Sequence, residues 1–275
     1  MIQRPSQHIF DVDWTFHFED EPEKTEIVRL PHSWNALDTM NTDPAQHYRR
    51  GVGVYECEFM PPEHSAGKRL WLRLGAIAQK GEIYFDAEQL SVNRGGYLPV
   101  EVEIPNRRGR LRVVADNTPD PDVIPSDMSD FYLYGGITRP GHLYSTGNSY
   151  IGPVHFEINA SDERADIMLH CTVNSRVAAS VDLQVSITSP ENVGTPNGAS
   201  VSTWKAEHAE ARLYKFKQRL PDIENPQLWS PDQPNLYRVD LQLTDASGAI
   251  LDEGHTHIGL RYFDFPAGGP FYLNG

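Results

Sequence analysis

The sequence lacks the features of several large protein classes. Its 275 residues contain no run of 18 or more apolar residues, so no membrane-spanning helix is predicted. Basic residues are also few: 24 Lys and Arg stand against 38 Asp and Glu, for a net charge of −14. Nucleic-acid binding needs a basic surface, so we expect no nucleic-acid partner. Because no apolar run is long enough to span a bilayer, we expect no membrane partner either.

Cysteine is scarce, and the motifs of cofactor chemistry are missing. Cys57 and Cys171 each lie within an alternating apolar segment, which predicts two buried free thiols. There is no Cys-x-x-Cys pair, glycine-rich phosphate loop or Gly-x-Ser-x-Gly elbow. His255 and His257 share a strand face, but no third ligand is evident, so no metal and no cofactor is predicted. The N-terminus shows no signal peptide, which leaves the native compartment open.

Helical periodicity is scarce as well, and alternation with a period of two takes its place. With 21 Gly and 21 Pro, the composition suits strands joined by many turns. Three alternating runs occur in each half of the sequence: 55–59, 70–74, 111–115, 167–173, 181–187 and 237–243. The pattern predicts an all-β fold of two β-sandwiches.

Two breaks divide the chain. A small polar run at 145–149 separates two strand-rich regions, and a Pro-Ala-Gly-Gly-Pro break follows Arg261 at 266–270. We therefore expect domains at 1–145 and 146–262, followed by a further segment at 263–275.

Several motifs, in order, resemble the N-terminal half of family 2 glycoside hydrolases, the family of β-galactosidases and β-glucuronidases. They are Leu-Pro-His-Ser-Trp-Asn at 30–35, Tyr-Arg-Arg-Gly-Val-Gly-Val-Tyr at 48–55, Gly-Gly-Tyr at 95–97, Asp-Phe-Tyr-Leu-Tyr-Gly-Gly-Ile-Thr-Arg at 130–139, Asn-Pro-Gln-Leu-Trp-Ser-Pro at 225–231, Pro-Asn-Leu-Tyr at 234–237, Gly-Leu-Arg at 259–261 and Phe-Tyr-Leu-Asn-Gly at 271–275. No single motif is specific, but their order along nearly the whole chain is.

The resemblance implies a jelly-roll (galactose-binding-like) sandwich at 1–145 and an immunoglobulin-like sandwich at 146–262. It also implies that 263–275 begins a truncated (β/α)₈ barrel, the domain that carries the catalytic carboxylates in the family. None of the 38 acidic residues has the family's Asn-Glu context, so no catalytic residue is predicted here.

One site residue follows from the resemblance. Asp130 opens the 130–139 motif, and in β-galactosidase-like members this aspartate reaches the sugar pocket. A carboxylate can accept hydrogen bonds from neighbouring sugar hydroxyls. The alternative is an aspartate that forms a turn before a strand. For Gly135 and Gly136 we expect a backbone role, for Arg139 an ion pair or a capped carbonyl, and for Trp34, Trp71, Trp204 and Trp229 packing rather than sugar stacking.

The expected function is that of the non-catalytic N-terminal portion of a retaining exo-β-glycosidase, most similar to β-galactosidases. In this role the chain would shape the substrate pocket and the domain interfaces of an enzyme of carbohydrate breakdown. Its partners would be a terminal β-linked sugar, the missing barrel and, in a homo-oligomer, its own copies. The alternatives are a free-standing carbohydrate-binding module and a structural interaction unit. The sequence leaves open which sugar the parent enzyme would cleave.

Overall fold

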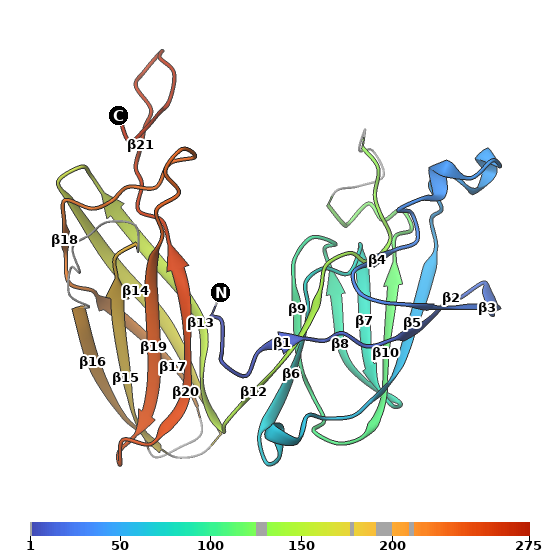
Figure 1. The fold of residues 1–275 in the computed structure, drawn as a ribbon, viewed down its shortest axis with the longest axis horizontal. Coiled ribbons are helices and arrows are strands. Elements are labelled where there is room, and N and C mark those ends of the chain that lie inside the picture. Colours follow the sequence, from blue (N-terminus) through green and yellow to red (C-terminus); the bar gives the residue numbers. More distant parts are fainter. Residues whose placement is uncertain (1, 125–130, 177–178, 191–199, 209–211) are drawn as a thin grey trace. The chain divides into compact units, whose positions relative to one another are not determined.

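The structure is a computed structural model that describes residues 2–124, 131–176, 179–190, 200–208 and 212–275. The described residues form strands and three short 3₁₀ helices, with no α-helix among them (Figure 1). The chain divides into two compact units. The first sandwich is Ser6–Ser145, and the second sandwich is Met1–Pro5 together with Thr146–Gly275. The all-β prediction is confirmed.

The first sandwich contains a six-stranded sheet of order β3-β2-β5-β10-β7-β8, a four-stranded sheet of order β1-β12-β6-β9 and a small pair, β11-β4. Its strands and 3₁₀ helices are β1 (His8–Ile9), β2 (Trp14–Phe18), β3 (Glu21–Val28), β4 (His32–Ser33), η1 (Asp38–Met40), η2 (Pro44–Gln46), β5 (Val52–Phe59), η3 (Glu63–Ser65), β6 (Arg69–Leu74), β7 (Lys80–Phe85), β8 (Glu88–Arg94), β9 (Val100–Ile104), β10 (Gly109–Asp116), β11 (Gly136–Ile137) and β12 (Gly141–Thr146).

The core of the first sandwich comes from the alternating positions that the sequence predicts. In β6, Leu70, Leu72 and Leu74 are buried while the residues between them are not, because successive side chains point to opposite faces of a strand. Large aromatic side chains fill the rest, among them Trp14 and Phe85.

The second sandwich has one sheet of order β13-β14-β17, with β18 also paired to β14, and another of order β16-β15-β19-β20. A last pair, β21-β22, follows. The strands are β13 (Ser149–Ala160), β14 (Arg164–Ser175), β15 (Ala179–Thr188), β16 (Ser200–His208), β17 (Arg212–Arg219), β18 (Ile223–Glu224), β19 (Tyr237–Asp245), β20 (Ile250–Ile258), β21 (Phe263–Asp264) and β22 (Tyr272–Leu273). Its core is a separate apolar cluster built from the inward residues of β14, β15 and β19.

The division differs from the expected one at the N-terminus. Met1–Pro5 belongs to the second sandwich, although the sequence places it in the domain at 1–145. The physical reason is that Gln3 pairs with His255 of β20 and Ile2 lies in the second core. Residues 263–275 group with the second sandwich as the β21-β22 pair, and their role as the start of a barrel stays a prediction.

Candidate functional site

The 30–35 and 130–139 motifs meet where β4 pairs with β11. Ser33 lies opposite Gly136, and His32 lies opposite Ile137. Gly136 has a φ of +113°, and a Cβ at this position would lie 2.5 Å from the carbonyl oxygen of His32. Only glycine fits such a position without strain. The expected backbone role of the glycine pair is confirmed.

Trp34 is seated between glycines and aromatic rings. A Cβ on Gly135 would lie 1.9 Å from Cζ2 of Trp34, and a Cβ on Gly53 would lie 2.6 Å from Cζ3. The indole stacks on Phe16 at 5.8 Å between ring centroids and meets Phe18 edge-on at 5.3 Å. Trp34 is therefore a packing residue, as expected, and it fixes how closely the 130–139 motif approaches the sheet.

Two buried asparagines tie the motifs together. Asn35 is 2% exposed, and its Oδ1 accepts a hydrogen bond from the backbone nitrogen of Gly135 at 2.7 Å. Asn117 is fully buried, and its Nδ2 donates to the carbonyl of Leu133 at 3.2 Å while its Oδ1 accepts from the nitrogen of Gly51 at 2.9 Å. The two amides also contact each other, with Asn117 Nδ2 3.4 Å from Asn35 Oδ1. Four segments distant in sequence are thus held in one arrangement.

Asp38 anchors Tyr132 of the 130–139 motif. Its Oδ2 accepts hydrogen bonds from Asn35 Nδ2 at 2.8 Å, the Tyr132 hydroxyl at 3.1 Å and the backbone nitrogen of Arg49 at 3.2 Å. Burial acts to raise the pKa of Asp38, but these hydrogen bonds together bring it below its usual value. Burial and the neighbouring Asp38 carboxylate raise the pKa of Tyr132. At neutral pH, Asp38 is therefore an ionised acceptor and Tyr132 a neutral donor.

The anchored tyrosine supports an aromatic cluster, made of Tyr48, Tyr132 and Tyr134. The ring of Tyr132 lies edge-on to Tyr48 at 4.5 Å and to Tyr134 at 4.9 Å. Tyr48 and Tyr134 are 55% and 50% exposed. A buried polar network therefore holds aromatic side chains that remain open to solvent.

A hollow of about 410 Å³ lies beside this cluster. Arg139 borders it and donates from Nη1 to the carbonyl of Tyr97 at 3.2 Å, so the expected carbonyl capping is confirmed. His32 also borders it, with Nδ1 2.8 Å from the hydroxyl of Tyr55, and burial lowers the pKa of the imidazole. Most of the lining comes from three of the sequence motifs: Pro31, His32 and Ser33 from 30–35, Tyr97 from 95–97, and Tyr134, Thr138 and Arg139 from 130–139. Ala36 and Ala78 complete it.

Asp130, the predicted sugar-binding residue, lies outside the described residues, which resume at Phe131. Its role stays a prediction.

The later motifs meet around Trp229 in the second sandwich. Asn274 donates from Nδ2 to the carbonyl of Trp229 at 3.1 Å and accepts at Oδ1 from the nitrogen of Tyr262 at 3.2 Å. The guanidinium of Arg261 lies 4.9 Å from the centroid of the Trp229 ring and 5.6 Å from that of Phe263. The 225–231, 259–261 and 271–275 motifs are therefore contact partners of one another. Phe263, Phe265, Phe271 and Tyr272 are exposed beside them.

The other singled-out residues are structural. Cys57 and Cys171 are free and buried, as expected, and burial raises the pKa of each thiol to about 12. The rings of His255 and His257 lie 5.6 Å apart. Among the described residues, no three His, Cys, Asp or Glu side chains are grouped so that they could hold a metal ion.

The packing role expected of the tryptophans also holds for Trp71. Trp71 stacks on Tyr144 at 6.1 Å, while the side chain of Trp204 lies outside the description. No helix in the described part of the chain has the length and apolar character needed to cross a membrane.

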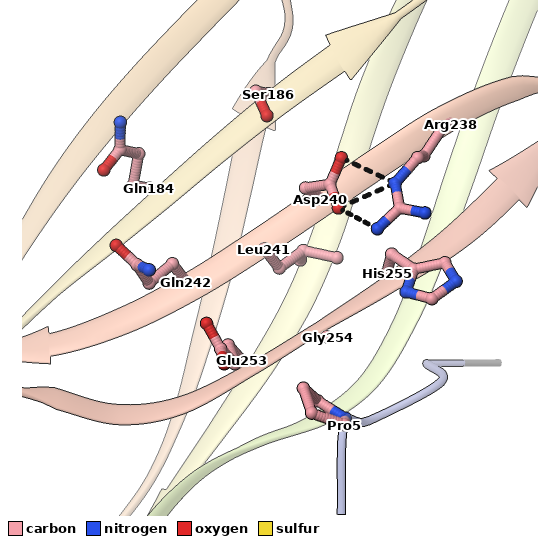
Figure 2. A pocket seen from close by; sticks show the side chains of 10 residues that line it. All are labelled: Pro5, Gln184, Ser186, Arg238, Asp240, Leu241, Gln242, Glu253, Gly254 and His255. Carbon is pink, nitrogen blue, oxygen red and sulfur yellow. Dashed lines mark hydrogen bonds and ion pairs between the residues drawn. The ribbon is translucent and has the colours of Figure 1, made fainter.

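A second hollow, of about 440 Å³, lies on the outer face of the β15-β19-β20 sheet (Figure 2). Polar side chains from neighbouring strands line it, including Gln184, Gln242 and Glu253. Arg238 is held there by Asp240, with Nε 2.9 Å from Oδ1. His255 supplies the only ring among its lining side chains apart from Pro5, so this hollow has no aromatic platform for a sugar.

The second sandwich matches a known family model. The model is described as Glycosyl hydrolases family 2, and it matches residues 149–261. This chain contains a glycosyl hydrolase family 2 domain. The resemblance drawn from the motifs is confirmed.

Known relatives extend the likeness to both sandwiches. A β-glucuronidase of Bacteroides fragilis is 28% identical over 96% of this chain, and a β-galactosidase of Thermoanaerobacter pseudethanolicus is 26% identical over 97%. A crystal structure of a Bacteroides uniformis β-glucuronidase covers 99% of the chain with a TM-score of 0.84 and 25% identity. The jelly-roll and immunoglobulin-like prediction is confirmed. The chain spans 39%, 37% and 34% of the length of these three proteins.

Sequence reasoning missed the residues that build the site. Asn117 reads as part of an Asp-Asn-Thr-Pro turn, and Asp38 lies outside every motif. The one local signal for Asn117 is its place directly after the buried run of β10, where a polar side chain can reach back under the neighbouring loops.

Proposed function

We propose that this chain is the non-catalytic, all-β front portion of a retaining exo-β-glycosidase, and that the aromatic cluster forms part of the wall of its sugar pocket. A (β/α)₈ barrel carrying the two catalytic carboxylates would follow it. The lengths of the relatives support this extension, since the chain matches little more than a third of each.

The observation that carries the proposal is the buried network under the aromatic cluster. Burying the side chains of Asn35 and Asn117, with the half-buried Asp38 beside them, costs desolvation, which their hydrogen bonds offset. The result is one fixed position for Tyr132 and for the two rings edge-on to it, Tyr48 and Tyr134, both about half exposed. Exposed aromatic side chains in a rigid arrangement are typical of a surface that is covered by a ligand or another domain.

The substrate class in this proposal is a β-linked sugar, with a β-glucuronide as the first to test. Two of the three relatives named above are β-glucuronidases and one is a β-galactosidase. Asp130, one residue before Phe131, is the proposed sugar contact, because a carboxylate accepts hydrogen bonds from vicinal hydroxyls.

Chromogenic β-glucuronides, β-galactosides and β-mannosides test the proposal. The chain alone should hydrolyse none of them, while the complete product of its gene should hydrolyse at least one. In that complete product, Asp130→Ala should raise KM and lower kcat, because a contact to a ring hydroxyl can strengthen toward the transition state. Asp122→Ala, at an exposed position of the same segment, is the matched control.

Two outcomes would contradict the proposal. One is turnover by the chain alone that is lost when one of its own acidic residues is mutated. The other is micromolar binding of a monosaccharide by the chain alone in calorimetry, which would support the free-standing carbohydrate-binding module instead.

A further inference from the structure

The N-terminal segment of the chain docks on the edge of the second sandwich through a single antiparallel β-bridge. Gln3 and His255 exchange both backbone hydrogen bonds, with Gln3 N 2.7 Å from His255 O and His255 N 2.9 Å from Gln3 O. β20 has β19 on its other side and no further strand in this sheet among the described residues. Ile2–Arg4 therefore covers an edge that would otherwise leave unpaired backbone groups.

The docked segment alternates as a strand does. Ile2 is 6% exposed and lies in the second core, while Gln3 is exposed. The Arg4 side chain, two positions after Ile2, is again only 7% exposed. The segment thus inserts an apolar side chain and a guanidinium into the sandwich, as expected for strand addition with specific side-chain pockets.

The apolar pocket depends on Gly254. A Cβ on Gly254 would lie 2.3 Å from Cγ2 of Ile2 and 2.7 Å from the carbonyl oxygen of Gln3. Figure 2 shows Gly254 on β20, with Pro5 and His255 close by. A side chain at 254 would close the place where Ile2 sits.

The charged pocket joins both sheets of the second sandwich. Arg4 pairs with Asp252 of β20, with Nη2 3.2 Å from Oδ2, and the Asp252 side chain is 6% exposed. Asp252 Oδ2 also accepts from the backbone nitrogen of Ile151 in β13 at 2.8 Å, and Arg4 Nη2 donates to the carbonyl oxygen of Ile151. The register of β13 against β14 shifts directly after Ile151. Arg4 therefore binds both the carboxylate of Asp252 and the backbone carbonyl of Ile151, next to the bulge in β13.

We propose that β13 and β20 form a strand-docking groove that recognises an apolar residue followed two positions later by arginine, and that Ile2–Arg4 is its occupant. Pro5 ends the pairing, because proline has no backbone N–H to donate. The groove is separate from the aromatic cluster of the first sandwich, and the proposal does not depend on the glycosidase assignment.

Binding in trans is the direct test. A short tether supplies an effective concentration in the millimolar range, so a segment that stays docked in cis corresponds to a dissociation constant below about 1 mM in trans. A chain lacking residues 1–5 should bind a fluorescent peptide with the sequence of residues 1–8 in this range. The Arg4→Ala peptide should bind roughly tenfold to a hundredfold more weakly, because Asp252 is left buried without its cation.

Hydrogen exchange in the intact chain gives a second test that needs no deletion. Gly254→Val should speed exchange of the His255 amide at least tenfold, since its acceptor is the displaced Gln3 carbonyl. Exchange in β5 of the first sandwich should not change. Ile250→Val is a matched control, because Ile250 lies in the same strand and its side chain is exposed.

Each result of these two experiments either supports the groove or contradicts it. Tight binding of the wild-type peptide with weak binding of the Arg4→Ala peptide supports the groove. Equal binding of both peptides, no binding of either, or unchanged exchange of the His255 amide in Gly254→Val would overturn the proposal.

Discussion

Asn117 shows how much of this fold depends on one polar side chain. It is fully buried, and its side chain forms hydrogen bonds with Gly51, Leu133 and Asn35. Asn117→Ala should lower the free energy of unfolding of the first sandwich by about 2–4 kcal/mol, because it leaves a buried N–H and a buried C=O without partners. Chemical denaturation followed by tryptophan fluorescence measures this loss.

Two variants control for the truncation itself. Asn117→Asp keeps the size of the side chain but replaces the Nδ2 donor with an oxygen that faces the Leu133 carbonyl, so it should be at least as destabilising. Gln89→Ala, at an exposed position, should stay within about 0.5 kcal/mol of the wild type. Loss of stability confined to Asn117→Ala would mean that the cavity matters and the hydrogen bonds do not.

His32 links the stability of the first sandwich to pH. Burial lowers the pKa of its ring in the folded chain, whereas an unfolded histidine titrates near pH 6.5. Below about pH 6.5 the unfolded chain binds a proton that the folded ring resists, so stability should fall as the pH drops toward 5. The contribution is a fraction of the limiting slope of about 1.4 kcal/mol per pH unit.

The change in the free energy of unfolding with pH, rather than its value at one pH, tests this effect. His32→Asn should flatten the loss of stability between pH 7 and pH 5, whereas His64→Asn, at an exposed position, should not. Part of the slope should remain in the variant, because burial and then Arg73 also lower the pKa of His142. Equal slopes for wild type and His32→Asn would contradict the assignment.

At the scale of elements, two glycines with nearly the same φ separate backbone strain from steric crowding. Gly95 has a φ of +116° with no atom within 4 Å of an added Cβ, and Gly136 has a φ of +113° with His32 O at 2.5 Å. Gly95→Ala should cost about 1–3 kcal/mol, from the backbone conformation alone. Gly136→Ala should cost about 1–3 kcal/mol more, since β11 must move away from β4.

Thermal and denaturant unfolding of the two variants side by side measures the difference. If Gly95→Ala and Gly136→Ala lose the same free energy of unfolding, β11 can move away from β4 at little cost. The β4-β11 pairing would then not hold the packing around Trp34 rigid.

The elements themselves were largely predictable, whereas their long-range partners were not. Alternation at 70–74 and 237–243 gives β6 and β19 directly, because burial on one face of a strand imposes a period of two. The pairing of Gln3 with His255 has no such local signal, since Ile-Gln-Arg-Pro at 2–5 contains one apolar residue before the proline and no alternating apolar run. Asn117 was hidden for a related reason. Its Asp-Asn-Thr-Pro context favours a turn, and only the tertiary structure shows which backbone groups the amide serves.

At the scale of the whole molecule, the chain has two hydrophobic cores with no residue in common. One cluster belongs to the first sandwich and contains Cys57, and the other belongs to the second and contains Cys171. Each core therefore carries one natural thiol, so the opening of each sandwich can be followed separately in the same chain.

Thiol labelling under native conditions should then report two independent stabilities. Burial raises the pKa of both thiols to about 12, so near pH 8 neither reacts as a thiolate until its own sandwich opens. Leu72→Ala should speed labelling of Cys57, and Leu183→Ala that of Cys171, because each fully buried leucine leaves a cavity that costs about 2–5 kcal/mol. Peptide mapping after a timed pulse of alkylating reagent distinguishes the two sites. If Leu72→Ala speeds both thiols equally, the two sandwiches open together. Labelling of Cys171 should also rise when residues 1–5 are deleted, since Ile2 belongs to the second core and not to the first.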